Sequence, residues 1–346
     1  MGLKMTERFA EGIGLILGAG ASRGVSYARK REVPSPLDRD FFDLLQRLNP
    51  KDAKDAESKD KTLRWVQQLS PDYWRSMERS FYTLHLRAYL REKLNRLPKE
   101  KLAPRGDEDV VSTFVITIGT LLRAAHGTET CKFHREILSH LWLQDVVLSF
   151  NYDLVVERAM KATPRFSKIP FGGWLYGFSK RPKEWLGPAI FKMHGSFNWT
   201  MPPVDGQSFG VRTRGWPALE SAPGFARFKQ MGTSYPIFLP FWDKRIEANP
   251  WKEVWIQAIE RLENCNSVIV WGYSLPQTDV KAQLVFQLAL GERVFNLCVI
   301  DPSIAVRDRW RAIFPDARFW EFDNVQQFLD HPPKWWQEHP NDEVED

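Results

Sequence analysis

The sequence predicts an α/β protein with a doubly wound parallel sheet, interrupted by a helical insertion. Short apolar runs alternate with amphipathic helical patterns, which favours a parallel sheet covered by helices. Glycine-rich or polar motifs follow five of these runs directly, whereas the stretch between the first and second run is mostly helical. We therefore divide the chain into a discontinuous sheet domain at 1–37 and 144–325, a helical insertion at 38–143 and a C-terminal tail at 326–346.

Composition and charge limit the class of protein. The 346 residues are 43% hydrophobic and 26% charged, which is typical of a globular protein with one or two domains. No run approaches the ~20 apolar residues of a membrane span, and the N-terminus has no apolar signal segment, so we expect a cytoplasmic protein. The three cysteines form no CxxC pair, which excludes a zinc ribbon. A net charge of +5 without a basic run argues against direct nucleic-acid binding.

The first apolar run, 13–17, ends in a glycine loop. A buried strand that breaks into glycines is typical of a phosphate-binding turn. Gly18 and Gly20 permit a tight turn near a pyrophosphate, and Ser22 and the amides at the following helix start can donate to it. Gly24 comes one place later than in the usual dinucleotide fingerprint. The structural alternative is a glycine turn without a ligand.

The helical insertion begins with Asp38, which we expect to cap a helix over Phe41–Leu48, where apolar residues recur at helical spacing. Residues 50–60 are predicted to be a charged, mobile connector. Further helical patterns cover 61–97, 110–125 and 134–143.

The remaining strands all end in polar motifs. They are predicted at 146–150, 190–193, 267–271, 296–300 and 318–322, with helices at 154–160, 251–264, 279–290 and 306–313 and a loop or lid segment at 200–244. The first four of these strands are followed by Asn-Tyr-Asp, His-Gly-Ser, Gly-Tyr-Ser and Asp-Pro. Because ligands of doubly wound sheets bind outside the carboxyl ends of the strands, we expect these motifs to converge on one site.

Each motif offers a specific chemistry. Asn151 can hold a ribose hydroxyl or orient a water molecule, and Asp153 can accept a hydrogen bond from a carboxamide, although an Asx turn that caps the next helix is the alternative. His194 is the histidine at the expected ligand edge, where a neutral imidazole can act as a general base. Asp301 can accept from two ribose hydroxyls, and strand-end turns are the alternative for it and for the Gly272–Ser274 motif.

In order, ILGAGAS, SFNYD, KMHGS, GYSLPQTD and VIDPS resemble the sirtuin-like NAD-binding domain in its bacterial defence-associated branch, and VPSPLDRDFF resembles that branch as well. The similarity covers 13–37 and 144–323 and implies a Rossmann-like fold with NAD as substrate. On the phosphate side, it implies contacts from Ala19, Gly20, Ser22 and Arg23, with Asp38 in the same pocket. On the nicotinamide side, it implies that Asn151 contacts the ribose or the attacking water, that Asp153 holds the carboxamide and that His194 is the base. On the adenosine side, it implies that Gly272 and Ser274 contact the adenylate half and that Asp301 contacts the ribose.

The sequence also departs from the protein-deacylating members of that family. It lacks their four-cysteine zinc ribbon and their Gly-Ile-Pro-Asp-Phe-Arg segment, which implies a metal-free NAD hydrolase with water as the acceptor. The resemblance further implies an effector that depletes NAD during phage infection, paired with a separate activator such as a HerA-like ATPase. The helical block and the fifteen tryptophans could form homo-oligomer contacts. A zinc-free deacylase and a non-catalytic NAD or ADP-ribose sensor remain as alternatives.

Overall fold

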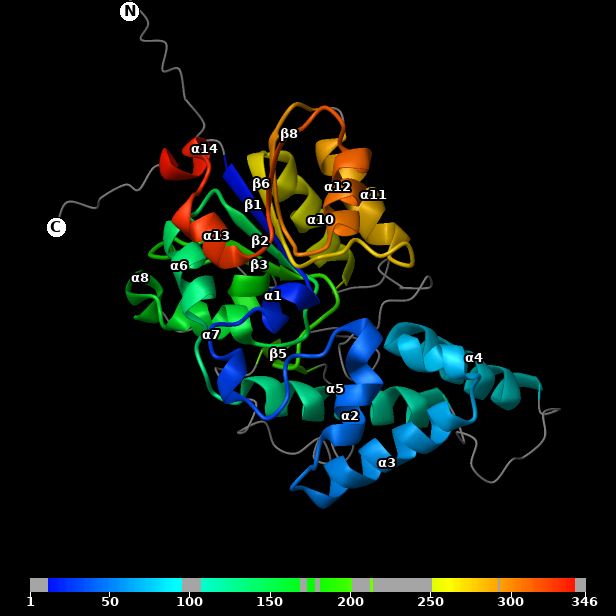
Figure 1. Ribbon diagram of the computed structural model, residues 1–346. Coiled ribbons are helices and arrows are strands. Elements are labelled where there is room, and N and C mark those ends of the chain that lie inside the picture. Colours follow the sequence, from blue (N-terminus) through cyan, green and yellow to red (C-terminus); the bar gives the residue numbers. More distant parts are fainter. Residues whose placement is uncertain are drawn as a thin grey trace, which may run out of the picture.

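The computed structural model describes residues 12–94, 107–168, 173–177, 181–200, 212–213, 251–291 and 293–339. It confirms the α/β prediction: a parallel sheet has helices on both faces, and a block of helices lies beside the sheet (Figure 1).

The main sheet has six parallel strands in the order β3-β2-β1-β6-β7-β8. The strands are β1 (Gly12–Leu17), β2 (Val146–Ser149), β3 (Ala189–Lys192), β6 (Cys265–Trp271), β7 (Asn296–Ile300) and β8 (Arg318–Phe322), within two residues of their predicted bounds. When the six strands are numbered by their position along the chain within this sheet, their order matches that of a doubly wound fold. The direction of winding reverses between β1 and β6. The crevice at the ends of these two strands is therefore the expected ligand position. A small antiparallel pair, β4 (Trp199–Thr200) with β5 (Arg212–Thr213), lies in the segment predicted as a loop, most of which is outside the described residues.

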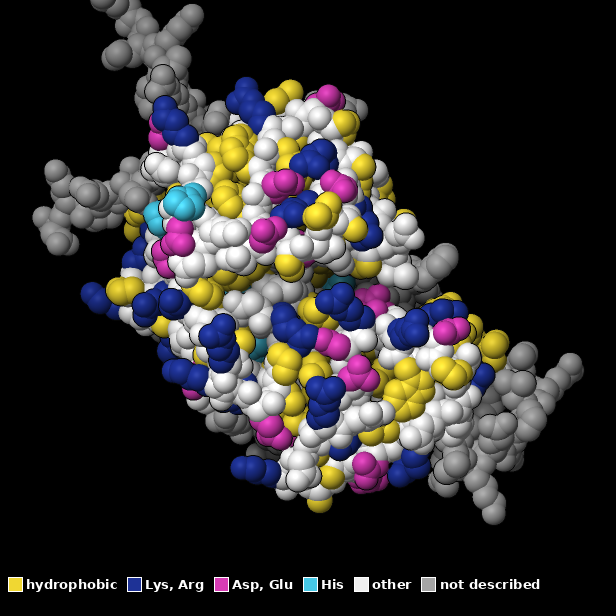
Figure 2. All heavy atoms as spheres, viewed as in Figure 1, with side chains coloured by type: hydrophobic (Ala, Val, Ile, Leu, Met, Phe, Trp, Pro, Cys, Tyr) yellow, Lys and Arg dark blue, Asp and Glu magenta, His cyan; other side chains and the backbone are white. Residues whose placement is uncertain are grey.

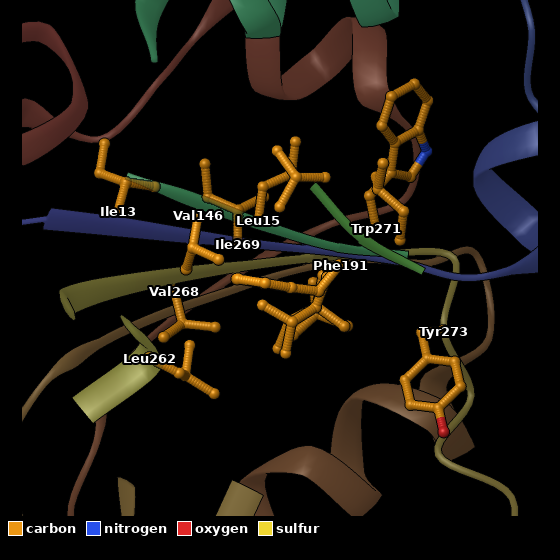
Figure 3. Packing of buried hydrophobic residues seen from close by; sticks show 14 of the residues in the cluster. Ile13, Leu15, Val146, Phe191, Leu262, Val268, Ile269, Trp271 and Tyr273 are labelled. Atoms are coloured by element: carbon orange, nitrogen blue, oxygen red, sulfur yellow. The ribbon is translucent and has the colours of Figure 1, made fainter. Parts of the chain in front are cut away.

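Helices cover the sheet on both faces because its first three strands are largely apolar and every residue of β1, β2 and β3 is buried, including Ser149 and Lys192 at the ends of β2 and β3. On one face lie α6 (Lys132–His140), α7 (Val155–Lys161) and α13 (Val325–Asp330), and on the other α10 (Trp251–Glu263), α11 (Val280–Leu290) and α12 (Ile304–Ile313) (Figure 1). Trp271 and Tyr273, at the end of β6, point to opposite faces (Figure 3). The Trp271 ring lies 4.2 Å from that of His134 on α6, and Tyr273 lies 6.2 Å from Phe286 on α11.

The helical block has a hydrophobic cluster of its own. It consists of α2 (Phe41–Arg47), α3 (Ala53–Gln67), α4 (Met77–Leu94) and α5 (Asp107–His126), packed around Phe42, Trp65, Phe81, Phe114 and Leu121. Although α6 follows within the range 38–143, its Ile137 and Leu138 belong to the core of the sheet. Short elements complete the described chain: α1 (Ala19–Arg23), α8 (Pro164–Ser167), α14 (Lys334–Gln337) and 3-10 turns at Ala28–Lys30, Asp38–Asp40, Pro71–Arg75 and Gly173–Tyr176.

One prediction in this block is wrong, and a second is confirmed only in part. Residues 50–60 are not a mobile connector, because α3 begins at Ala53 and the Asp52 side chain caps it by accepting from the Lys54 amide at 2.9 Å. Most of the charged residues of α3 are exposed, Asp55 pairs with Arg123 of α5, and Ser58 and Thr62 are buried. The helical pattern predicted over 61–97 is likewise broken, since α3 ends at Gln67 and α4 begins at Met77; residues 95–97 lie outside the described residues.

Asp38 does not cap the helix that follows it. It opens a 3-10 turn, and its Oδ1 accepts a 2.8 Å hydrogen bond from the Glu78 amide at the start of α4. The helix α2 begins after Asp40, whose carboxylate also binds the Leu37 amide and Arg23. A tertiary contact therefore replaces the predicted local cap, and Asp38 ties the chain after β1 to the helical block.

Candidate functional site

A cavity of about 1000 Å³ lies between the carboxyl ends of the strands and the helical block. The molecular surface is hollowed between these two parts (Figure 2). The loops after β1, β2, β3, β6 and β7 line the cavity, and the helical block adds Met77, Glu78, Ile118 and Leu122. The candidate residues from the sequence that line it are Ala19, Gly20, Ser22, Arg23, Asp38, Asn151, Asp153, His194, Gly272, Ser274 and Asp301. Gly18 does not line it.

The glycines of the β1 loop pack directly on the β6 loop. The Gly18 amide donates to the Trp271 carbonyl at 3.1 Å, and the Gly20 amide donates to the Gly272 carbonyl at 2.9 Å. Gly272 has a φ of +63°, and a Cβ there would lie 2.2 Å from the Ala21 nitrogen. These glycines therefore allow two loops to meet at the crossing between β1 and β6, and the amides of Gly18 and Gly20 are engaged by β6 rather than by a ligand.

A chain of buried hydrogen bonds links the β1 loop to the β2 loop. Asn151 Nδ2 donates to the Gly18 carbonyl at 2.8 Å and to Ser22 Oγ at 2.9 Å. The Ser22 hydroxyl in turn donates to Asp153 Oδ2 at 2.6 Å, and Asp153 Oδ1 accepts from the Val155 amide at 3.0 Å. Asp153 thus forms the Asx turn that we stated as its structural alternative, and the Ser22 proton points to Asp153. Asn151 and Asp153 hold the wall of the cavity in place.

The Asp153 carboxylate is kept ionised by its surroundings. Burial alone would raise its pKa, but the charges of His126 and Lys192 and the Ser22 hydrogen bond outweigh burial and hold the pKa below its ordinary value. Lys192 is fully buried beneath it, and its Nζ donates to the Asp153 carbonyl at 2.6 Å and lies 3.5 Å from Glu157. Lys192 lies within the strand predicted at 190–193, but the sequence pattern does not indicate that its side chain is buried.

His194 is paired with a carboxylate that we did not select from the sequence as a candidate. The turn after β3 is made by Gly195 with a φ of +87°, and it places His194 Nε2 2.9 Å from Asp279 Oδ2. Because a carboxylate only accepts hydrogen bonds, the geometry favours the tautomer with the proton on Nε2 and the lone pair on Nδ1. Asp279 is buried, caps α11 and also accepts from the Tyr273 hydroxyl at 3.0 Å. This is the arrangement of an oriented general base.

A second carboxylate, Glu78, comes from the helical block. It lies in the first turn of α4 and lines the cavity, and its Oε2 accepts from Thr278 Oγ1 at 3.2 Å. Thr278 directly precedes Asp279, so the two carboxylates occupy the same end of the cavity. Glu78 and Thr278 are 200 residues apart, so no local sequence pattern indicates this contact.

The cavity wall also holds two arginines and Asp301. Arg23 donates to the Ser35 carbonyl at 2.7 Å and pairs with Asp40, and its pKa is lowered by burial and by the charge of Arg39. Arg39 lines the same cavity and forms no ion pair within the described part of the chain. Asp301 Oδ1 accepts from the Ser303 amide at 2.9 Å, the strand-end turn stated as its alternative, and burial raises its pKa.

No protein-family model matches the chain, and no curated protein matches it either. Within the described ranges, no group of three or more His, Cys, Asp or Glu side chains is arranged to hold a metal ion. Over the same ranges, none of the helices is long and apolar enough to cross a membrane. The geometry of the cavity is therefore the basis on which we infer function.

Proposed function

We propose that this chain hydrolyses NAD at the bond between nicotinamide and ribose, giving nicotinamide and ADP-ribose. The observation that carries the proposal is the cavity at the crossing of β1 and β6, which Asn151 lines together with the His194–Asp279 pair. Doubly wound sheets bind nucleotides at this position. A cavity of about 1000 Å³ is also at the upper end of ligand pockets, as a dinucleotide requires.

In the proposed reaction, His194 accepts a proton at Nδ1 from the attacking water, and Asp279 stabilises the resulting imidazolium. The water oxygen forms a bond to C1′ of the ribose while the C1′–N bond breaks, and the electron pair leaves with nicotinamide. General-base assistance of this kind contributes roughly 10²–10⁴-fold. Asn151 keeps the loops after β1 and β2 in register and positions the ribose and the water against His194.

The other half of the substrate would lie toward the arginines. Since the amides of Gly18 and Gly20 bond to β6, we assign the pyrophosphate to the side chains of Arg23 and Arg39. The carboxylate of Asp301 accepts from the adenosine ribose hydroxyls in this arrangement.

The test is nicotinamide release from NAD by the purified chain without any peptide. We expect His194→Ala and Asn151→Ala each to lower the rate at least ~10²-fold, whereas His331→Ala, an exposed histidine, is the matched control and retains activity. Release that survives in both site variants would overturn the assignment. Release only with an acylated peptide would identify a deacylase instead, and binding without turnover would identify a sensor.

A NAD hydrolase needs control, because constant activity would deplete the cell that makes it. We propose a defence effector that is activated by assembly or by a separate protein such as a HerA-like ATPase. In support of self-assembly, α11 exposes Val280, Leu284 and Leu288, one turn apart and 57%, 52% and 61% exposed. Sedimentation of the wild type and of Leu284→Glu tests the contact, and nicotinamide release with the neighbouring gene product tests the activator. A wild-type monomer that is fully active on its own would contradict both activation by assembly and activation by a separate protein.

A further inference from the structure

The helical block reaches the candidate site through the start of α4. The Glu78 amide is fixed by Asp38 at 2.8 Å, and its carboxylate accepts from Thr278 at 3.2 Å. Its backbone and side chain are thus anchored from two sides, one on the chain after β1 and one on the loop after β6. This places the half-buried Glu78 carboxylate on the cavity wall beside Thr278, the residue that precedes Asp279.

The same end of the cavity is electrostatically negative. The pKa of Tyr152 is raised well above its ordinary value by burial and then by the charges of Glu78 and Asp279. The pKa of Tyr273 is raised in the same direction by burial, by Asp279 and by Glu78. Both phenols line the cavity, so two carboxylates act on one small region of it. Asp279 is hydrogen-bonded to His194 and Tyr273, and Glu78 is the negative charge that the helical block adds.

We propose that Glu78 is a specificity-determining and catalytic carboxylate that makes this end of the cavity select a cationic nicotinamide ring, that of NAD⁺ over NADH. This inference rests on the proposed NAD hydrolysis. The two dinucleotides have nearly the same shape but differ by one positive charge on the ring, and a carboxylate in a poorly hydrated cavity distinguishes them by Coulomb attraction. As the C1′–N bond breaks, the positive charge moves from the ring to the ribose, and Glu78 remains beside it.

The experiment measures binding rather than turnover. In a His194→Gln background, the glutamine amide keeps a donor for Asp279 but removes the base, so NAD⁺ is not consumed. Calorimetry then gives the dissociation constants of NAD⁺, NADH and ADP-ribose. We expect NAD⁺ to bind about tenfold more tightly than NADH, and Glu78→Gln to reduce this preference to within about twofold while ADP-ribose affinity changes less than about twofold.

Three further variants separate charge from structure. Glu78→Asp keeps the charge and should keep the preference, and Thr278→Val removes the hydrogen-bond partner but leaves the carboxylate. Asp72→Asn removes an exposed carboxylate from the 3-10 turn before α4 and is the charge-matched control. A general loosening of the cavity weakens NAD⁺ and NADH equally, so the ratio of their affinities reports on Glu78 alone.

The outcomes distinguish this inference from the proposed function. If all three nucleotides bind and the preference for NAD⁺ survives Glu78→Gln, the role of Glu78 is overturned while the nucleotide site stands. If none of the three binds, the proposed function fails and this inference fails with it. Loss of the preference in Glu78→Gln, with retention in Asp72→Asn and Glu78→Asp, supports the assignment.

Discussion

At the scale of single residues, Asp279 connects the most groups in the candidate site. Its Oδ2 accepts from His194 and from Tyr273, and its Oδ1 lies 3.4 Å from the Ala282 amide at the start of α11. A buried carboxylate that accepts from three donors is held rigidly next to the ring. We therefore regard Asp279 as the residue that positions His194.

Asp279→Asn should lower the rate of nicotinamide release about 10²-fold and move the acidic limb of its pH profile to lower pH. The sign follows from the charge: without the carboxylate, the imidazolium of His194 loses its stabilisation, its pKa falls, and the base stays unprotonated at lower pH. Tyr273→Phe removes one hydrogen bond but leaves the charge, so its profile should keep the wild-type position. Superimposable profiles for wild type and Asp279→Asn would contradict this role.

The depressed pKa of Asp153 predicts how the free energy of unfolding depends on pH. Since its folded pKa is depressed, its contribution to the free energy of unfolding is present above the unfolded value of about 3.9 and is lost as pH falls through the folded pKa. Asp153→Asn should cost roughly 1–3 kcal/mol at neutral pH, and the difference from wild type should shrink below about pH 4. Denaturant unfolding at both pH values measures it, with exposed Asp72→Asn as control. If the difference in unfolding free energy between wild type and Asp153→Asn did not depend on pH, the charge of the Asp153 carboxylate would not contribute to stability.

At the scale of elements, the contact between the β1 and β6 loops defines the floor of the cavity. Gly20 and Gly272 meet backbone to backbone, and a Cβ on Gly20 would lie 2.7 Å from the Gly272 Cα. The Gly272 amide also donates to the Ile300 carbonyl at 3.0 Å, so three strand ends are held together at one point. This close approach is possible because neither loop carries a side chain there.

Gly272→Ala should destabilise the fold by roughly 3 kcal/mol or more, because it combines a positive φ with a backbone clash. The φ is +63°, and the new methyl carbon would lie 2.2 Å from the Ala21 nitrogen. Gly24→Ala is the matched control, since its φ is −83° and its nearest contact is 3.3 Å. Denaturant unfolding of the two variants compares them. Equal stability would show that the loops can separate without cost.

How far the sequence predicts each element depends on what its buried face is made of. The strand β1 was predictable because all six of its residues are buried and the run is apolar. The first half of α3 was missed because Ser58, the residue buried there, is polar, so the start of the helix reads as a charged linker, whereas Trp65 and Val66 lie in the predicted helical pattern. The convergence of the strand-end motifs followed from the parallel topology. Asp279 and Glu78 were missed because only tertiary packing brings Asp279 to His194 and Glu78 to Thr278.

At the scale of the whole molecule, the cavity lies where two separately packed clusters meet. Phe150 and Tyr273 stack at 4.0 Å on the sheet side, whereas Ile118 and Leu122 of α5 line the cavity from the helical block. A ligand that fills the cavity therefore contacts both clusters at once. Binding free energy then adds to the stability of both parts rather than of the sheet alone.

This arrangement predicts that ADP-ribose protects α4 and α5 from hydrogen exchange as well as the loops after β1, β6 and β7. Saturation at about 100 times the dissociation constant adds about 2.7 kcal/mol to the free energy of unfolding. AMP is the matched control ligand: it lacks the second ribose, which we place beside Glu78, so it should protect the β7 loop but leave α4 unchanged. Protection by ADP-ribose that is confined to the sheet loops would show that the helical block does not contact the ligand. Protection that spreads into α4 with ADP-ribose but not with AMP would show that the block closes the ribose end of the site, the end to which Glu78 brings its charge.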